Sequence, residues 1–220
     1  MEPCVLWRRS CVLGTNSTTT SLMSHPARRT IGLVPDPGKL LVAQLQLAHA
    51  GELAAGYAYR GHWRSVRDPE ERERIHKIED EEWHHRRLVA GILRDLGAKP
   101  RPLREAVFWT IGRTLGTLCH AVGWFLPMYA AGRLERRNIV EYEDAAVYAR
   151  ASGHFELLDC LLTMAEVEWE HEQYFRAKVA GHPLLRLFPL WPAPPPRERI
   201  RDRFEGEDPT AREAVAEVVR

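Results

Sequence analysis

Apolar residues recur at every third or fourth position along four stretches of the chain, and this spacing predicts four amphipathic helices. We expect the helices at about residues 39–66, 69–96, 128–151 and 154–180. In each of them a carboxylate interrupts the apolar face. Burial of a carboxylate without a partner strongly opposes folding. The pattern therefore predicts a helical bundle whose core contains something that compensates these charges.

The second and fourth helices carry the most specific form of this interruption. Glu82 and His85 lie three residues apart in the apolar face of the second helix, and Glu168 and His171 have the same spacing in the fourth. Either pair alone would be a weak signal, because Glu and His are common on helices. Two such pairs at matching places in two apolar faces indicate a common site.

The first and third helices each add one core-facing carboxylate, Glu52 and Glu135. On the second helix a competing pair, Glu81 and His84, also has the three-residue spacing. His84 shares its face with charged residues, whereas the pair one position later shares its face with apolar ones. We therefore assign Glu81 and His84 to solvent.

Together these positions have the composition of a metal site. Four carboxylates would balance the formal charge of two divalent ions, which would offset the cost of burying them. Carboxylate and imidazole ligands suit iron or manganese, and helix bundles hold metal pairs with a Glu from each of two helices and Glu-x-x-His from the other two. The six candidate metal ligands are Glu52, Glu82, His85, Glu135, Glu168 and His171.

A long uncharged segment precedes the third helix. Nineteen residues between Arg113 and Arg133 carry no formal charge. A membrane-spanning helix needs about 20 predominantly apolar residues, but the glycines and the proline of this segment make it a poor span. It is either a buried crossover into the third helix or a surface that faces one leaflet of a membrane. We favour burial, because the bundle needs the third helix in its core.

The two ends of the chain differ from the middle. Residues 1–37 are rich in arginine, serine and threonine and poor in acids, which is typical of a targeting segment or a disordered extension. We expect the bundle domain at 38–182. Residues 183–220 read as a proline-rich spacer, which is either packed along the bundle surface or extended, and a charged tail that is solvated or partly disordered, with a short helix after Thr210.

Charge and cysteine content exclude several classes of protein. The formal net charge of +1 gives no indication of a nucleic-acid partner. The four cysteines include no Cys-x-x-Cys pair, which argues against a disulfide framework, a zinc ribbon or an attached rubredoxin module. A reducing compartment fits this usage best.

The ligand order resembles that of the ferritin-like di-iron carboxylate proteins over residues 39–180. Within that superfamily, the stretch His49-Ala50-Gly51-Glu52, followed by Tyr57 and Tyr59-Arg60-Gly61, is similar to the opening motif of the demethoxyubiquinone hydroxylase family. Tyr142, seven residues after Glu135, is similar to the third-helix motif of that family.

The chain departs from that family at two places. The family has a histidine immediately before the third-helix tyrosine, where this chain has Glu141. It also has further histidine and aspartate residues after the last Glu-x-x-His, where this chain continues with Glu172, Gln173 and Tyr174. The departures concern the surroundings of the substrate and the electron input rather than the metal ligands.

The resemblance implies two iron ions, with manganese as the alternative metal, and O2-dependent hydroxylation of a polyprenyl benzoquinol such as demethoxyubiquinol. Electrons would come from NADH or a partner reductase. The chain has no GxGxxG fingerprint with which to bind a dinucleotide in the Rossmann manner. The resemblance further implies a cytoplasmic protein with peripheral membrane contact through 114–132, on the inner face of the membrane (the mitochondrial inner membrane in a eukaryote). The sequence assigns no oligomeric state.

Two residues near the ligands have alternative interpretations. Tyr142 is either a neighbour of the metals that relays charge or a tyrosine of the core. His49, one helical turn before Glu52, either orients that ligand or packs on the helix surface. Two other functions stay open: a rubrerythrin-like peroxidase or oxidase, and a non-catalytic metal-binding bundle that docks partners at the membrane.

Overall fold

The structure is a computed structural model that describes residues 36–205. Within this range all regular structure is helical. In chain order the elements are α1 (Pro37–Ser65), α2 (Pro69–Asp95), α3 (Pro102–Leu118), α4 (Phe125–Ala151), the 3-10 turn η2 (Phe155–Leu157), α5 (Leu158–Val179), the 3-10 turn η3 (Pro183–Arg186) and α6 (Arg199–Glu205). The N-terminal segment up to residue 35 and the short helix expected after Thr210 lie outside the described residues.

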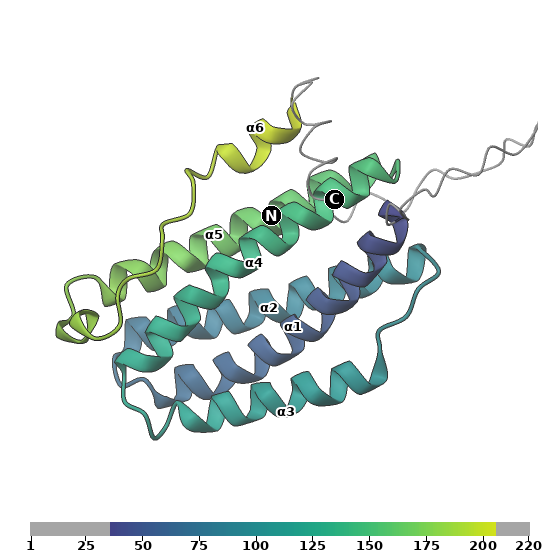
Figure 1. The fold of residues 1–220 in the computed structure, drawn as a ribbon. Helices are drawn as coiled ribbons and strands as arrows, with labels where there is room; N and C mark the ends of the chain where they lie inside the picture. The colour runs from purple at the N-terminus through teal and green to yellow at the C-terminus, as the bar shows by residue number, and fades with distance from the viewer. Residues whose placement is uncertain (1–35, 206–220) are drawn as a thin grey trace, which may run out of the picture.

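Four helices, α1, α2, α4 and α5, lie side by side as a bundle (Figure 1). The first two helices, α1 and α2, each begin after an aspartate that caps the helix N-terminus. The carboxylate of Asp36 accepts a hydrogen bond from the backbone N–H of Gly38 at 2.9 Å, and that of Asp68 accepts one from Glu71 at 2.9 Å. A proline follows each cap and needs no hydrogen bond in the first turn. The predicted all-α, ferritin-like four-helix bundle is confirmed.

The apolar core consists of two clusters at different heights along the bundle. Large buried members of the first cluster are Leu41, Leu45, Leu93, Ile139 and Leu161. Large buried members of the second are Ile75, Ile78, Met128 and Phe175. In all four helices the predicted ligands come between the residues of the two clusters, so the bundle places them at one level.

The expectation of a buried crossover at 114–132 is wrong for the first part of this segment. Residues 102–118 form the separate helix α3, which packs on the outer side of α1, and only Gly112 and Gly116 of α3 are buried (Figure 1). We call its outward apolar side chains the α3 face: Leu103, Val107, Trp109, Ile111, Leu115 and Leu118. Burial begins at Phe125, where α4 turns inward.

The contact between α3 and α1 depends on glycine. A Cβ at Gly112 would lie 2.4 Å from the carbonyl oxygen of Ala54, and one at Gly116 would lie 2.6 Å from that of Tyr57. Both distances are far inside van der Waals contact, so a larger residue could not be accommodated without separating the helices. These two glycines therefore let the backbones of α3 and α1 approach each other closely.

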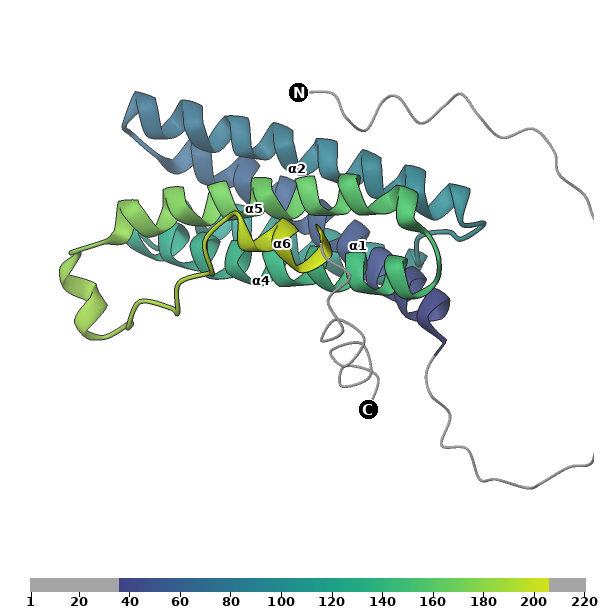
Figure 2. The same ribbon diagram turned by 90° about the horizontal axis from the view of Figure 1, so that it is seen from above.

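After α5 the spacer packs along the bundle, which is one of its two expected arrangements, and the start of the charged tail packs there too. The indole of Trp191 is 7% exposed and occupies the space beside Gly132, where a Cβ would lie 2.3 Å from the ring. Helix α6 packs along α5 (Figure 2), with Ile200 2% exposed and an ion pair of 2.6 Å between Arg201 and Glu166. Trp191 thus anchors the spacer, and Ile200 anchors the start of a tail that was expected in solvent.

Among residues 36–205, no helix has both the length and the apolar content needed to cross a membrane.

Candidate metal centre

All six predicted ligands are buried at one level of the bundle. Glu52 on α1 and His85 on α2 are each 3% exposed, and the other four ligands are fully buried. The register of each helix produces this result, because every one of these residues continues an apolar stripe. The choice of Glu82 and His85 over Glu81 and His84 agrees with this burial, since His84 is exposed.

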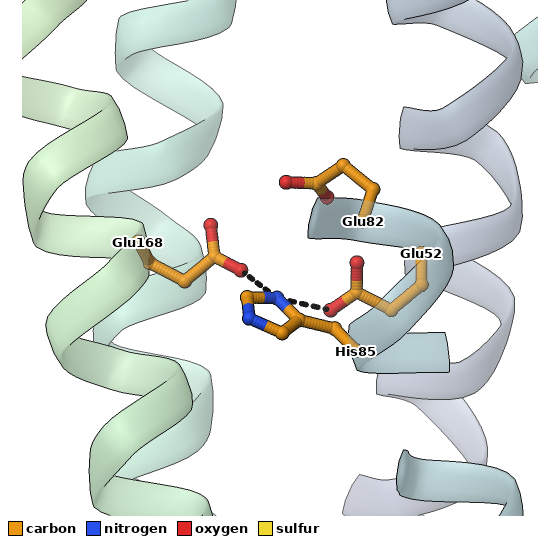
Figure 3. Close-up of side chains that lie close together, drawn as sticks. All are labelled: Glu52, Glu82, His85 and Glu168. Carbon is orange, nitrogen blue, oxygen red and sulfur yellow. Dashed lines mark hydrogen bonds and ion pairs between the residues drawn. The ribbon is translucent and has the colours of Figure 1, made fainter. Parts of the chain in front are cut away.

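The ligand atoms form two overlapping groups. The first contains Glu52, Glu82, His85 and Glu168, and the second contains Glu82, Glu135, Glu168 and His171. Within each group the ligand atoms lie within 4.8 Å of one another. Figure 3 shows the first group, with side chains from α1, α2 and α5 turned toward one another. The two groups share Glu82 and Glu168. Two carboxylates common to both groups are expected where a bundle holds a pair of ions.

Both imidazoles present Nδ1 to the centre. Nδ1 of His85 lies 2.9 Å from Oε1 of Glu168 and 3.9 Å from Oε1 of Glu52 (Figure 3). Nδ1 of His171 lies 3.3 Å from Oε1 of Glu82 and 3.6 Å from Oε2 of Glu168. The same ring nitrogen of each histidine is therefore available to a metal ion.

Several of these inward atoms have no hydrogen-bond partner among the described residues. They are Oε2 of Glu52, both carboxylate oxygens of Glu82, Oε2 of Glu168 and Nδ1 of His171. An unpartnered buried polar atom opposes folding by about 1–3 kcal/mol, so five of them at one point require a compensating ligand. Carboxylate oxygens and imidazole nitrogens are the donors that iron and manganese accept, and the residues present therefore fit such ions.

The pKa values of the carboxylates reflect their burial and their closeness to one another. Burial, together with the charges of neighbouring carboxylates, raises the pKa of Glu52 and that of Glu135 well above the usual value. Burial opposes ionisation of Glu168 too, but the neighbouring imidazoles of His171 and His85 outweigh it and lower its pKa. Without metal the centre thus retains protons, which cations can replace on binding.

Two tyrosines hold the outer carboxylates, and they do so in a matching way. The hydroxyl of Tyr142 donates to Oε1 of Glu52, and the hydroxyl of Tyr59 donates to Oε1 of Glu135. Each tyrosine follows the glutamate of its own helix by seven residues and reaches the glutamate of the other helix. Sequence reasoning placed Tyr142 near the ligands, but it named Tyr59 only as part of the family motif and gave it no role at the centre. The identical spacing was the available signal.

Glu81 belongs to the centre, although the sequence analysis assigned it to solvent. Its Oε2 lies 2.8 Å from Nε2 of His171. Because a carboxylate oxygen can only accept, Nε2 of His171 carries the hydrogen of this contact, and Nδ1 is the ring nitrogen that faces the centre. The helical stripe could not reveal this contact, since Glu81 lies at the edge of the apolar face and reaches across to α5.

His49 pairs with Glu105. Its Nδ1 lies 2.8 Å from Oε1 of Glu105 on α3, and the guanidinium of Arg86 lies 2.6 Å from the other oxygen of that carboxylate. Arg86 also donates to the backbone carbonyl of His49. His49, Arg86 and Glu105 thus form a polar junction among α1, α2 and α3, in place of a contact in which His49 orients Glu52. The spacing of His49 and Glu52 gives no indication of Glu105.

Comparison with known proteins supports the resemblance seen in the sequence. The family model described as ubiquinone biosynthesis protein COQ7 matches residues 39–142. A 3-demethoxyubiquinol 3-hydroxylase of Francisella philomiragia is 30% identical over 104 residues, which are 45% of this chain and 49% of that protein. The chain thus spans about half the length of this curated relative. No solved structure matches the chain.

Proposed function

We propose that this chain is a di-iron, O2-dependent hydroxylase of a polyprenyl benzoquinol, because residues 39–142 match the model of the COQ7 family, within the ferritin-like di-iron superfamily. Demethoxyubiquinol is the substrate that the relative's name suggests. The observation that carries the proposal is the pair of ligand groups that share Glu82 and Glu168. The match with the family ends before α5, so the second Glu-x-x-His supports the proposal independently.

In this proposal Glu82 and Glu168 would serve both ions, Glu52 and His85 would help to hold one of them, and Glu135 and His171 would help to hold the other. Two ferrous ions would supply the electrons that reduce O2 at the ring to be hydroxylated; manganese is the alternative metal. The side chains themselves bind the ions, exclude bulk water and fix the outer carboxylates through tyrosine hydroxyls. Burial of the ligands strengthens each of these electrostatic contacts.

The hydroxyl of Tyr142 also stabilises the ionised form of Glu52, which is the form that binds a metal ion. Burial and the neighbouring carboxylates raise the pKa of its hydroxyl well above the usual value. The hydroxyl therefore stays protonated and donates to Glu52 rather than competing for a metal ion. Tyr59 supports Glu135 by the same kind of hydrogen bond, and Asn138 donates to the other oxygen of Glu135 at 2.9 Å.

We propose that the α3 face contacts one leaflet of a membrane, from which a polyprenyl substrate would be taken. The support is the outward exposure of Leu103 (80%), Val107 (48%) and Leu115 (44%) on a helix with few charges. Apolar surface of this kind, gathered on one element, marks an interaction site in soluble proteins. Electrons would come from NADH or a partner reductase, and the protein would be peripheral to the membrane.

The test is the mass of the product. Iron-loaded protein, demethoxyubiquinol in vesicles, NADH and O2 should give a quinol that is one oxygen atom heavier, labelled when 18O2 is used. The Glu168→Ala variant is the control and should give none. Consumption of hydrogen peroxide without ring hydroxylation would favour the rubrerythrin-like alternative, and metal binding without either reaction would favour a non-catalytic bundle.

A further inference from the structure

The metal centre has two nearly equivalent halves. Glu52 and Tyr59 of α1 correspond to Glu135 and Tyr142 of α4, with the same spacing and with crossed hydrogen bonds. The Glu-x-x-His of α2 corresponds in the same way to that of α5. A residue that reaches the centre from one half therefore has an identifiable counterpart in the other.

Glu81 breaks this equivalence. It directly precedes the Glu-x-x-His of α2, and it holds the histidine of the opposite half, His171, through the 2.8 Å contact with Nε2. The counterpart position, directly before the Glu-x-x-His of α5, is Val167. A valine side chain has no hydrogen-bond acceptor, so it cannot support His85 as Glu81 supports His171.

The surroundings of the two histidines agree with this difference. Glu81 is itself held by Arg74, with Nη1 3.3 Å from Oε2, and by Lys77, with Nζ 3.6 Å from Oε1. Among the described residues, the carboxylates that pair with His85 are Glu52 and Glu168, and both are candidate ligands rather than outer supports. One imidazole is thus fixed from outside the centre, and the other is not.

We propose that Glu81 is a positioning residue for His171 and that it makes the two metal positions unequal, the position of His171 being the tighter one. The inference rests on the metal site of the proposed function. A carboxylate that accepts the outer N–H of a ligating histidine fixes the ring and makes its inner nitrogen more basic. Loss of such a partner typically weakens metal binding by about 10- to 100-fold.

The experiment is a titration of the metal-free protein with Co2+, followed through the visible absorption of the bound ion. The wild type should bind two ions in two steps of unequal affinity. Glu81→Ala should weaken the tighter step by about 10- to 100-fold. Glu81→Gln keeps an acceptor for Nε2 of His171, so its affinity for Co2+ in this step should fall less than that of Glu81→Ala. Asp80→Ala, an exposed acid one residue away, should change neither step.

A double-mutant comparison separates positioning from a general effect on the fold. In a His171→Ala background, Glu81→Ala should cause no further loss, because its partner is already absent. In a His85→Ala background, Glu81→Ala should weaken metal binding as much as it does in the wild type. Thermal unfolding of each metal-free variant, followed by circular dichroism, verifies that the proteins compared are folded.

The outcomes are distinct. Two ions bound with equal affinity, or equal effects of Glu81→Ala in both histidine backgrounds, would overturn the inference while the di-metal proposal stands. A wild-type protein that binds no pair of ions would remove the proposed metal site and this inference with it.

Discussion

The centre of the bundle and helix α3 depart from ordinary burial in opposite directions. At the centre, charged groups are withdrawn from water: Glu82, Glu135 and Glu168 are fully buried. On α3, apolar groups are left in water: Leu103 is 80% exposed and Leu115 is 44% exposed. Neither arrangement helps the chain to fold, because folding favours buried hydrocarbon and solvated charge.

The comparison shows where interactions outside the polypeptide are needed. Among the described residues, the centre has five buried polar atoms without hydrogen-bond partners, which metal ions would satisfy. The α3 face has apolar side chains that remain exposed, which lipid would cover. The remainder of the bundle, by contrast, consists of two conventional apolar clusters and needs neither.

The largest effect is expected from Glu168→Ala, because Glu168 belongs to both ligand groups. We expect both ions to be lost, with affinities reduced by more than the roughly 100-fold that a merely supporting residue contributes. Metal analysis after anaerobic loading with ferrous iron measures this. The control is Glu170→Ala, on the same helix but with a side chain 48% exposed. Retention of one ion at wild-type affinity would show that Glu168 is not shared.

A buried imidazole outside the ligand set tests how much the interior of the bundle tolerates charge. His62 is 3% exposed, and burial lowers its pKa from 6.5 to about 4. Between these two values the unfolded chain binds more protons than the folded one, so stability falls as the pH falls through this window. At about 1.4 kcal/mol per pKa unit the full loss is about 3 kcal/mol.

The corresponding variant is His62→Leu, which should flatten the dependence of the free energy of unfolding on pH between about 6.5 and 4. Urea unfolding of the metal-free protein at several pH values measures it. His120→Leu removes an exposed imidazole and should leave the slope as it is. An unchanged slope in His62→Leu would mean that His62 accepts a proton in the folded protein as readily as in water.

The attachment of α3 is tested by Gly116→Ala. A Cβ at this position would lie 2.6 Å from the carbonyl oxygen of Tyr57, so we expect a loss of stability of about 1–3 kcal/mol. Gly91→Ala on α2 is the matched control. Its Cβ would meet no atom nearer than 3.9 Å, and alanine should stabilise that helix by about 0.5–1 kcal/mol. Equal effects of the two changes on the denaturation midpoint would contradict the close packing of α3.

The smallest effect is expected from a single charge on the α3 face. Leu115→Glu should weaken binding to vesicles of phosphatidylcholine and phosphatidylglycerol by about tenfold, because one apolar side chain no longer enters the bilayer. Cosedimentation measures this binding. Val140→Glu introduces the same charge at a comparably exposed position of α4 (37%) and should have no effect. If the wild type does not bind vesicles, the membrane proposal is wrong.

Sequence periodicity predicted the bundle well because its helices bury one face each. The four predicted helices agree with α1, α2, α4 and α5 to within a few residues, and the six candidate ligands are all buried. Periodicity failed for α3, because its three charged residues, Arg104, Glu105 and Arg113, are too few to mark a polar face from which its surface could be recognised. The glycines at 112 and 116 were the informative residues, since they indicate close approach of another backbone.

Contacts between helices account for the rest of what sequence reasoning missed. Glu81 and His49 each find their partner on a helix distant in the chain, α5 and α3 respectively. No spacing within one helix encodes such a pair. Tyr59 is different, because its position seven residues after Glu52 repeats that of Tyr142 after Glu135, and this internal repeat could have been used.

The most direct test of the central claim is the number of ferrous ions that the purified, metal-free chain binds under anaerobic conditions, with Mössbauer spectroscopy of the 57Fe-loaded protein to show whether they form a pair. The account predicts two ions per chain, coupled after oxidation through shared carboxylates. Zero or one ion per chain, or two ions that stay magnetically independent after oxidation, would contradict it.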